Sequence, residues 1–191
     1  MDYKKILVPL DGSKLAETAL AHAEKIAKGC TIPQIVLITV TEPMRIKAPA
    51  GERIEQLPVP YQSPIIYYGN VVSGGDVIFR GSIKDLPVSI GKMAKTGYNY
   101  LIRIAEKLDK EGIQVSIVVL IGNVAQEIVH FAEEEMVDLI VMASSGRTGF
   151  RRWDVANSAK KVFRLTNIPI LLTKPPVGFK ETKPVRKGKA L

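Results

Sequence analysis

Short apolar runs alternate with longer amphipathic stretches along most of this chain. The runs are rich in Ile, Val and Leu, and each has the length of a buried strand. They lie at Lys5–Pro9, Ile35–Val40, Val115–Leu120, Asp138–Ala143 and Ile168–Thr173. Strands that alternate with helices predict βαβ units, and therefore a doubly wound parallel sheet of five strands with right-handed crossovers. Pro169 lacks a backbone N–H and therefore favours an edge position for the last strand.

The stretches between the strands repeat apolar residues at three- and four-residue steps, which is typical of amphipathic helices. Helices are expected at about Lys14–Lys28, at Ser89–Glu111, from Asn123 onward, and at Asn157–Leu165. Ser13 can cap the first helix, and Asn123 with Gln126 forms a capping box at the third. Gly29 and Gly112 are expected to end the first two helices.

The segment 44–86 is too long for a simple connection between a strand and a helix. It is rich in Pro and Gly, and its apolar pieces Tyr67–Val72 and Val77–Phe79 flank Ser73–Asp76. This arrangement predicts a short hairpin. The segment leaves the carboxyl end of the second strand, where ligands bind in such sheets. Two interpretations of this segment are open. One is a lid over a crevice, and the other is a decoration or a dimer contact.

The charge of the chain is concentrated at its end. The 191 residues carry a net charge of +8 and suit one domain of ordinary size. Pro175–Leu191 holds five basic residues and one acidic residue, so that five minus one gives +4, half of the total. A short Pro-, Gly- and Lys-rich end is typical of a disordered solubilising tail. We therefore expect a domain over 1–174 with an insertion at 44–86, a basic tail over 175–191, and no nucleic-acid partner.

The cysteine and histidine content and the short apolar runs bear on the cellular location and on metal or membrane binding. Cys30 is the only cysteine, so an intrachain disulfide is impossible and a reducing cytoplasm is the simplest location. His22 and His130 lie far apart without metal-ligand spacing, so no structural zinc site is expected. The apolar runs are far shorter than the roughly 20 residues of a membrane-spanning helix, and the start lacks a signal-peptide region. We expect a cytoplasmic protein without a membrane partner.

Three segments whose residues can bind a ligand should meet at the carboxyl edge of the sheet. They are Pro9–Ser13 after the first strand, Val40 at the end of the second, and Ala143–Gly149 after the fourth. A glycine turn followed by a helix can direct backbone N–H groups at an anion. The carboxylate of Asp11 can accept from ribose hydroxyls or from an adenine amino group. A plain surface turn around Gly146 and a helix-capping role for Asp11 are the alternatives.

Four blocks in order and spacing give the chain its resemblance to a known family. They are Lys4–Ser13, Gly122–Val129, Asp138–Gly149, and Ser158–Arg164 followed by Ile168–Lys174. The sequence resembles the universal stress protein family. The resemblance implies a three-layer α/β/α sandwich of the adenine-nucleotide α-hydrolase-like type, with a five-stranded parallel sheet in the order 3-2-1-4-5. It also implies a homodimer joined through strand 5, Ile168–Thr173.

The same resemblance implies where a nucleotide would bind. Some family members bind ATP through a spaced glycine motif, whose positions here hold Ala143, Gly146, Ala156 and Asn157, so that only Gly146 keeps its glycine. Asp11 matches the family's adenosine-contacting acid, and Val40 matches the residue whose backbone meets the adenine. The candidate binding residues are Pro9, Asp11, Val40, Ala143, Gly146, Arg147, Gly149, Ala156, Asn157 and Ser158.

These observations predict a non-catalytic homodimeric stress-response module that binds an adenine nucleotide, ATP or AMP, with Mg²⁺ only beside a triphosphate. The alternative is a nucleotide-free scaffold that contacts an unidentified protein partner through the insertion at 44–86. An enzyme is disfavoured because the first strand is followed neither by a Ser-Gly-Gly-x-Asp-Ser loop nor by G-x-G-x-x-G. Slow ATP hydrolysis stays open as a variant.

Overall fold

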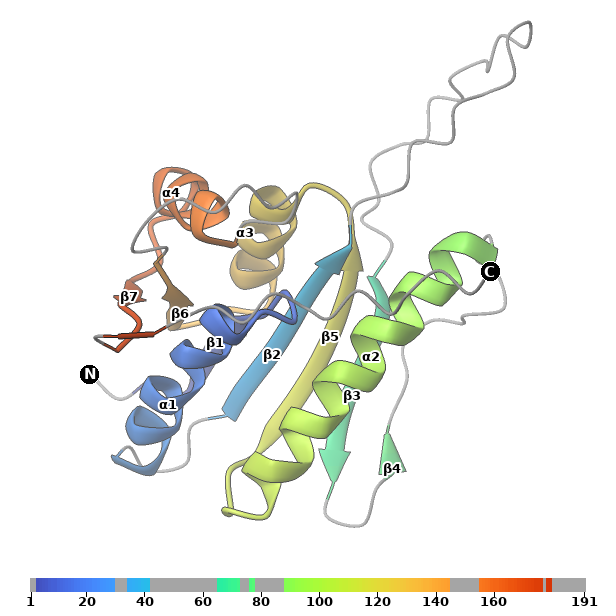
Figure 1. The fold of residues 1–191 in the computed structure, drawn as a ribbon, viewed down its shortest axis with the longest axis horizontal. Coiled ribbons are helices and arrows are strands. Elements are labelled where there is room, and N and C mark those ends of the chain that lie inside the picture. The colour runs from blue at the N-terminus through green and yellow to red at the C-terminus, as the bar shows by residue number, and fades with distance from the viewer. Residues whose placement is uncertain are drawn as a thin grey trace, which may run out of the picture.

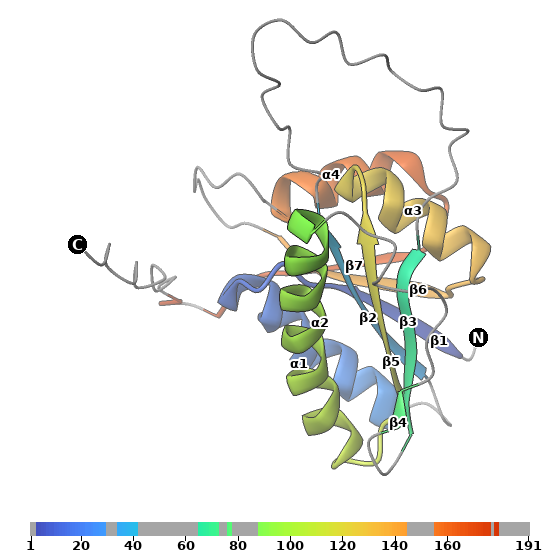
Figure 2. The same cartoon turned by 90° about the vertical axis from the view of Figure 1, so that its right-hand side faces the viewer.

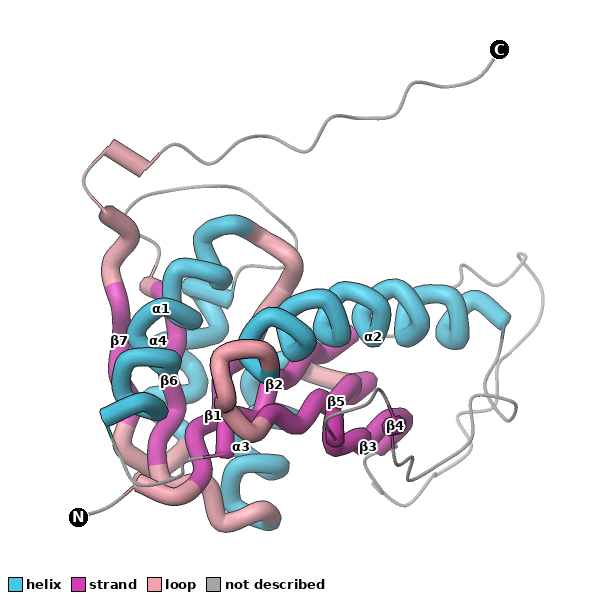
Figure 3. Tube along the Cα trace, turned by 90° about the horizontal axis from the view of Figure 1, so that it is seen from below, coloured by secondary structure: helices cyan, strands magenta, loops and turns pink. Residues whose placement is uncertain are grey.

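One sheet runs through the chain. The computed structural model describes residues 3–29, 34–41, 65–72, 76–77, 88–144, 155–176 and 178–179. The strands within these ranges are β1 (Lys5–Pro9), β2 (Gln34–Thr41), β3 (Ile65–Val72), β4 (Asp76–Val77), β5 (Val115–Ile121), β6 (Leu139–Ala143) and β7 (Ile170–Thr173). They lie side by side in the order β4-β3-β5-β2-β1-β6-β7, which can be followed from one edge to the other in Figure 3.

The five strands β5-β2-β1-β6-β7 are parallel, as predicted. Numbered among themselves along the chain, they have the order 3-2-1-4-5, which confirms the predicted topology. Because the pairs are parallel, the carboxyl ends of these strands lie at one edge of the sheet. That edge contains the carboxyl ends of β1 and β2. Asp11 follows the end of β1 in the chain.

The predicted hairpin in the insertion is confirmed, and its position in the sheet is new. β3 pairs antiparallel with β4 through Val72 and Asp76. β3 also pairs antiparallel with β5, from Ile65 opposite Leu120 to Val71 opposite Val115. The hairpin therefore extends the parallel sheet beyond β5. The rest of the insertion, on which the lid interpretation depends, lies outside the described residues.

Two helices cover each face of the sheet. The helices are α1 (Lys14–Gly29), α2 (Val88–Asp109), α3 (Val124–Glu134) and α4 (Val155–Leu165). Figures 1 and 2 show α1 and α2 on one face and α3 and α4 on the other. This arrangement confirms the predicted three-layer sandwich.

The core is split by the sheet into two apolar clusters, because successive strand residues point to opposite faces. In β1, Ile6 and Val8 belong to the cluster under α1 and α2, whereas Leu7 belongs to the cluster under α3 and α4. The central strands are buried on both sides, which explains their unbroken apolar runs.

The helix ends agree with most of the predicted caps. The Ser13 side chain accepts from the Ala16 N–H at 3.0 Å, and the Asn123 side chain accepts from the Gln126 N–H at 3.4 Å. Gly112 has a φ of +78° just after α2, as expected for a helix-ending glycine. Gly29 also ends its helix, but as the last residue of α1 and without the positive φ of a glycine just beyond a helix end.

The last strand is an edge strand, as Pro169 indicated. However, β7 begins at Ile170, one residue after the proline, rather than at Ile168. Pro169 contributes its carbonyl oxygen, which accepts from the Ile140 N–H at 3.0 Å. The missing N–H of the proline thus falls just outside the strand.

Candidate ligand pocket

A pocket lies at the carboxyl ends of β1 and β2, on the face that α3 and α4 cover. The space between its walls, counted out into open solvent, is about 310 Å³. It is lined by Pro9, Leu10, Asp11, Ile38, Val40, Val124, Ile128 and Ser158. Most of these side chains are apolar, and the polar ones belong to Asp11 and Ser158. A largely apolar pocket with few polar groups suits a flat heteroaromatic ring that is oriented by one or two hydrogen bonds.

The carboxylate of Asp11 is fixed by the turn that carries it. The Ser13 N–H donates to Asp11 Oδ1 at 2.9 Å, which forms an Asx turn. Gly12 has a φ of +80°, a conformation that glycine adopts without strain. The alternative interpretation, in which Asp11 caps the turn into the first helix, is therefore borne out, and it does not exclude a ligand contact. A carboxylate has about four lone-pair positions, so one backbone contact leaves it able to accept from a ligand.

The strands supply one wall of the pocket. The Leu10 N–H donates to the Ile38 carbonyl at 2.8 Å, which continues the pairing of β1 and β2 one step beyond Pro9. Ile38 and Val40 lie two residues apart on β2, so both side chains project to the face of α3 and α4. Val40 is 8% exposed, so its side chain packs into the core as well as lining the pocket.

Helix α3 supplies the opposite wall, through Val124 and Ile128 one turn apart. Its start is tied to β2 because the Gly122 N–H donates to the Thr41 carbonyl at 3.0 Å. A Cβ on Gly122 would lie 2.2 Å from Glu127 Oε1, and its φ is +156°. A side chain at position 122 would therefore require the buried Glu127 side chain to move and would place a residue with a Cβ at a positive φ.

Tyr100 of α2 and Glu17 of α1 form a second group of polar side chains near the Asp11 turn. The Tyr100 hydroxyl of α2 donates to Glu17 Oε1 at 3.4 Å. Burial raises the pKa of Tyr100, and the negative charges of Glu17 and Asp11 raise it further. The hydroxyl therefore remains protonated and able to donate at neutral pH.

The structure brings together four of the predicted site residues, Pro9, Asp11, Val40 and Ser158, in one pocket. Ala143 is not in its lining, because its buried side chain belongs to the apolar cluster under α1 and α2. Ala156 and Asn157 lie in the first turn of α4. Gly146, Arg147 and Gly149 lie outside the described residues, so their convergence on this pocket stays a prediction.

Sequence reasoning missed four lining residues, Leu10, Ile38, Val124 and Ile128. A signal for them was present. Ile38 shares a strand face with Val40, and Val124 and Ile128 lie four residues apart on one helix face. An apolar stripe on a helix does not distinguish a core face from a pocket wall.

No group of three or more His, Cys, Asp or Glu side chains in the described ranges is arranged to hold a metal ion. None of the helices in those ranges has the length and apolar content required to cross a bilayer.

Comparisons with known proteins identify the family of this chain. A model of the universal stress protein family matches residues 2–174, so this chain belongs to the universal stress protein family. Universal stress protein MJ0577 of Methanocaldococcus jannaschii is 28% identical over 173 residues, which cover 90% of this chain and 95% of the relative. Universal stress protein MJ0531 of the same organism is 27% identical over 174 residues, covering 91% and 84% of the two chains.

Solved structures have the same fold. The structure of hypothetical protein MJ0577 superposes with a TM-score of 0.60 at 24% identity, covering 92% of this chain and 99% of that one. UspA of Lactobacillus plantarum superposes with a TM-score of 0.61 at 15% identity, covering 90% and 98%. At these identities the likeness concerns the fold alone, and it agrees with the doubly wound sheet described above.

Proposed function

We propose that this protein is a non-catalytic, homodimeric stress-response module of the cytoplasm that binds an adenine nucleotide, ATP or AMP, in the pocket beside Asp11. The observation that carries the proposal is a carboxylate fixed by its own turn in the lining of an otherwise largely apolar pocket. The apolar side chains can enclose an adenine ring, and the carboxylate can accept from the ribose hydroxyls or the adenine amino group.

Two proteins of the same fold support the choice of an adenine nucleotide. One is a universal stress protein in complex with cAMP, which superposes with a TM-score of 0.55 at 14% identity. The other is a universal stress protein family protein from Arabidopsis thaliana with AMP bound, with a TM-score of 0.54 at 13% identity. Both ligands contain the adenine and ribose that the pocket beside Asp11 is suited to accept.

The phosphate end of the ligand would meet the turn after β6 and the start of α4. Gly146, Arg147 and Gly149 can supply backbone N–H groups and a cationic fork, and Ala156, Asn157 and Ser158 follow in the first turn of α4. The methyl group of Ala143 faces α1 and α2, so it takes no room from a phosphate on the opposite face. Mg²⁺ would accompany only a triphosphate, whose oxygens supply most of its ligands.

The pocket offers little for catalysis. Its polar side chains are Asp11, whose Oδ1 already accepts from the Ser13 N–H, and Ser158. We therefore expect binding without appreciable turnover. ATP hydrolysis faster than about one per second, the low end of ordinary enzyme rates, would contradict this part of the proposal.

The proposal is tested by titration calorimetry with AMP and ATP on the wild type and two pocket variants. Asp11→Asn keeps the oxygen that accepts from Ser13 but removes the charge, so affinity should fall about tenfold with little loss of stability. Ser158→Met extends an apolar side chain into the pocket and should reduce affinity for both nucleotides. Lys161→Met is the matched control, because this exposed residue of α4 lies outside the pocket lining.

Two outcomes would contradict the proposal. One is a wild type that binds neither nucleotide near millimolar concentration, which would favour the scaffold alternative through the insertion at 44–86. The other is a wild type whose affinity is unchanged by both Asp11→Asn and Ser158→Met, which would place the nucleotide elsewhere. Mass spectrometry of ligand released from freshly purified protein would identify a retained nucleotide directly.

A further inference from the structure

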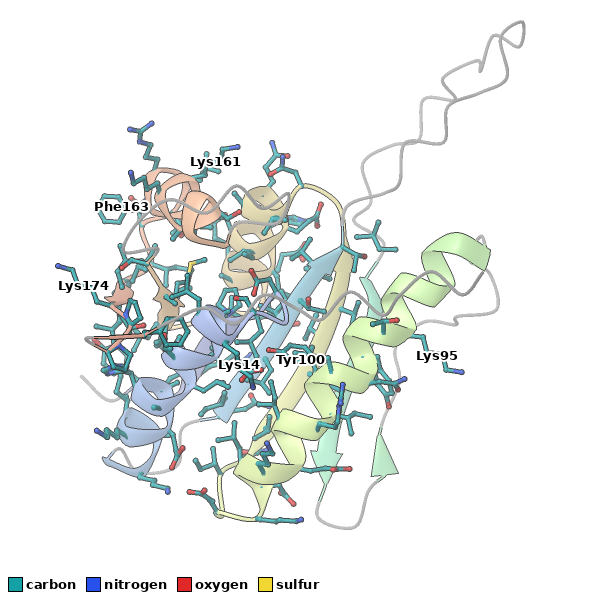
Figure 4. All side chains as sticks on the ribbon, in the orientation of Figure 1. Lys14, Lys95, Tyr100, Lys161, Phe163 and Lys174 are labelled. Carbon is teal, nitrogen blue, oxygen red and sulfur yellow. The ribbon has the colours of Figure 1, made fainter. Side chains whose placement is uncertain are left out.

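The turn that carries Asp11 is linked to helix α2, which lies on the opposite side of the sheet from the pocket. Tyr100 of α2 makes this link. Its ring packs against the apolar cluster under α1 and α2, and its hydroxyl reaches Glu17 in the first turn of α1. Figure 4 labels Tyr100 on α2 and Lys14 at the start of α1, two helices that cover the same face of the sheet.

Each polar group in this link has a defined partner. Glu17 Oε1 accepts from the Tyr100 hydroxyl at 3.4 Å, and Glu17 Oε2 forms an ion pair with Lys14 Nζ at 2.7 Å. The Glu17 N–H donates to the Ser13 carbonyl at 3.2 Å, so that α1 begins directly at the Asp11 turn. The Tyr100 hydroxyl thus contacts the first turn of α1, four residues after the Ser13 that accepts from Glu17 and donates to Asp11.

We propose that Tyr100 is a positioning residue for the nucleotide site, which holds the Asp11 carboxylate in its binding geometry through Glu17 and the start of α1. The inference rests on the proposed function, because it assigns Tyr100 a role in ligand affinity that acts through Asp11.

Tyr98 offers a matched control on the same helix. Its ring is partly buried against the same apolar cluster. Burial alone raises the pKa of Tyr98, whereas Glu17 and Asp11 also contribute at Tyr100. Replacing either tyrosine by phenylalanine removes one hydroxyl and keeps the ring. The change at Tyr100 removes the hydroxyl that donates to Glu17, in the first turn of α1.

The test is a double-mutant cycle with AMP as the ligand, in the full-length protein. Tyr100→Phe should weaken AMP binding about three- to tenfold, as expected for one hydrogen bond, whereas Tyr98→Phe should leave it unchanged. In an Asp11→Asn background, Tyr100→Phe should have little further effect, because the carboxylate on which it acts is gone. Amide hydrogen exchange of Gly12 and Ser13 in the ligand-free protein should be faster in Tyr100→Phe than in Tyr98→Phe.

The outcomes separate this inference from the proposed function. If the wild type binds AMP and Tyr100→Phe binds equally well, or loses the same factor in both backgrounds, Tyr100 does not act through Asp11 and the inference is wrong while the function stands. If the wild type does not bind AMP, both fail, and faster exchange at Gly12 would then assign Tyr100 a structural role only. If Asp11→Asn abolishes AMP binding, the mutant cycle cannot be completed and amide hydrogen exchange decides. Unchanged exchange of Gly12 and Ser13 in Tyr100→Phe then overturns the inference. Faster exchange together with weaker AMP binding of Tyr100→Phe supports it.

Discussion

Met136 holds an uncommon backbone conformation at the end of α3. Its φ is +50°, and it is the one non-glycine residue with positive φ in the described ranges. The Met136 N–H donates to the Glu133 carbonyl at 3.2 Å, and the Val137 N–H donates to the Ala132 carbonyl at 2.9 Å. This is the helix-ending position at which glycine is usual. The side chain is 82% exposed, so burial compensates little of the backbone cost.

Met136→Gly is therefore expected to stabilise the protein by about 0.5–1 kcal/mol, because glycine enters the left-handed region without a Cβ clash. Urea denaturation followed by circular dichroism measures the free energy of unfolding. Met136→Ala is the control: it removes the same exposed side chain but keeps the Cβ, and should match the wild type. Equal stability of the glycine and alanine variants would show that the conformation carries no strain.

Single residues of the candidate site differ in how far the sequence could predict them. Asp11 and Val40 lie at or just after strand ends, so chain position alone indicated their shared edge, whereas Ser158 was indicated by the family resemblance. Val124 looks like any other core position of an amphipathic helix until the neighbouring strand is placed. Tyr100 could not be predicted, because its contact with Glu17 depends on the tertiary position of α2 and not on any local pattern.

Among the elements, strands buried on both faces were the easiest to predict. Their apolar runs are unbroken, and β1 and β5 match the expected segments to within one residue. The hairpin of the insertion was predicted from its turn, but its pairing with β5 was not. A turn fixes the register within a hairpin, whereas its attachment to a sheet depends on which edge is free.

The approach of α2 to the sheet depends on a glycine one turn before Tyr100. A Cβ on Gly97 would lie 2.8 Å from Thr39 Cγ2 of β2, closer than real carbon atoms approach. Gly97→Ala should therefore destabilise the protein by about 1 kcal/mol, because overpacking costs about 1–3 kcal/mol and the helix propensity of alanine returns up to about 1 kcal/mol. The free energy of unfolding in urea measures this difference.

Gly29→Ala is the matched control for that prediction. Gly29 also lies in a helix, but a Cβ there would meet no atom within 4 Å. We expect its replacement to leave the free energy of unfolding unchanged or slightly increased, since alanine is the better helix former. If Gly97→Ala were as stable as Gly29→Ala, α2 would have room to shift, and its contact with β2 would not be set by the glycine.

At the scale of the whole molecule, the two edges of the sheet differ in whether further strands extend them. The edge beyond β5 is extended by β3 and the short strand β4, a common way to limit further pairing. The edge at β7 has no such extension within the described residues, and it exposes Leu171 at 36% and Leu172 at 42%. Phe163 and Leu165 of α4 are also exposed, and Phe163 can be found in Figure 4 near Lys161. These features support the proposed homodimer through Ile168–Thr173.

Leu172→Lys should therefore convert a dimer into a monomer, because an unpaired ammonium in the interface would lose its hydration. A desolvation cost of several kcal/mol per ion corresponds to at least about a hundredfold weaker association. Sedimentation velocity over a range of protein concentrations measures this shift. Met136→Lys is the control, since it also replaces an exposed apolar side chain but lies at the turn between α3 and β6, at the other end of the parallel strands. The pocket lies beside β1 and β2, so the Leu172→Lys monomer should still bind AMP. A wild type that sediments as a monomer, or a Leu172→Lys variant that stays dimeric, would exclude β7 as the interface.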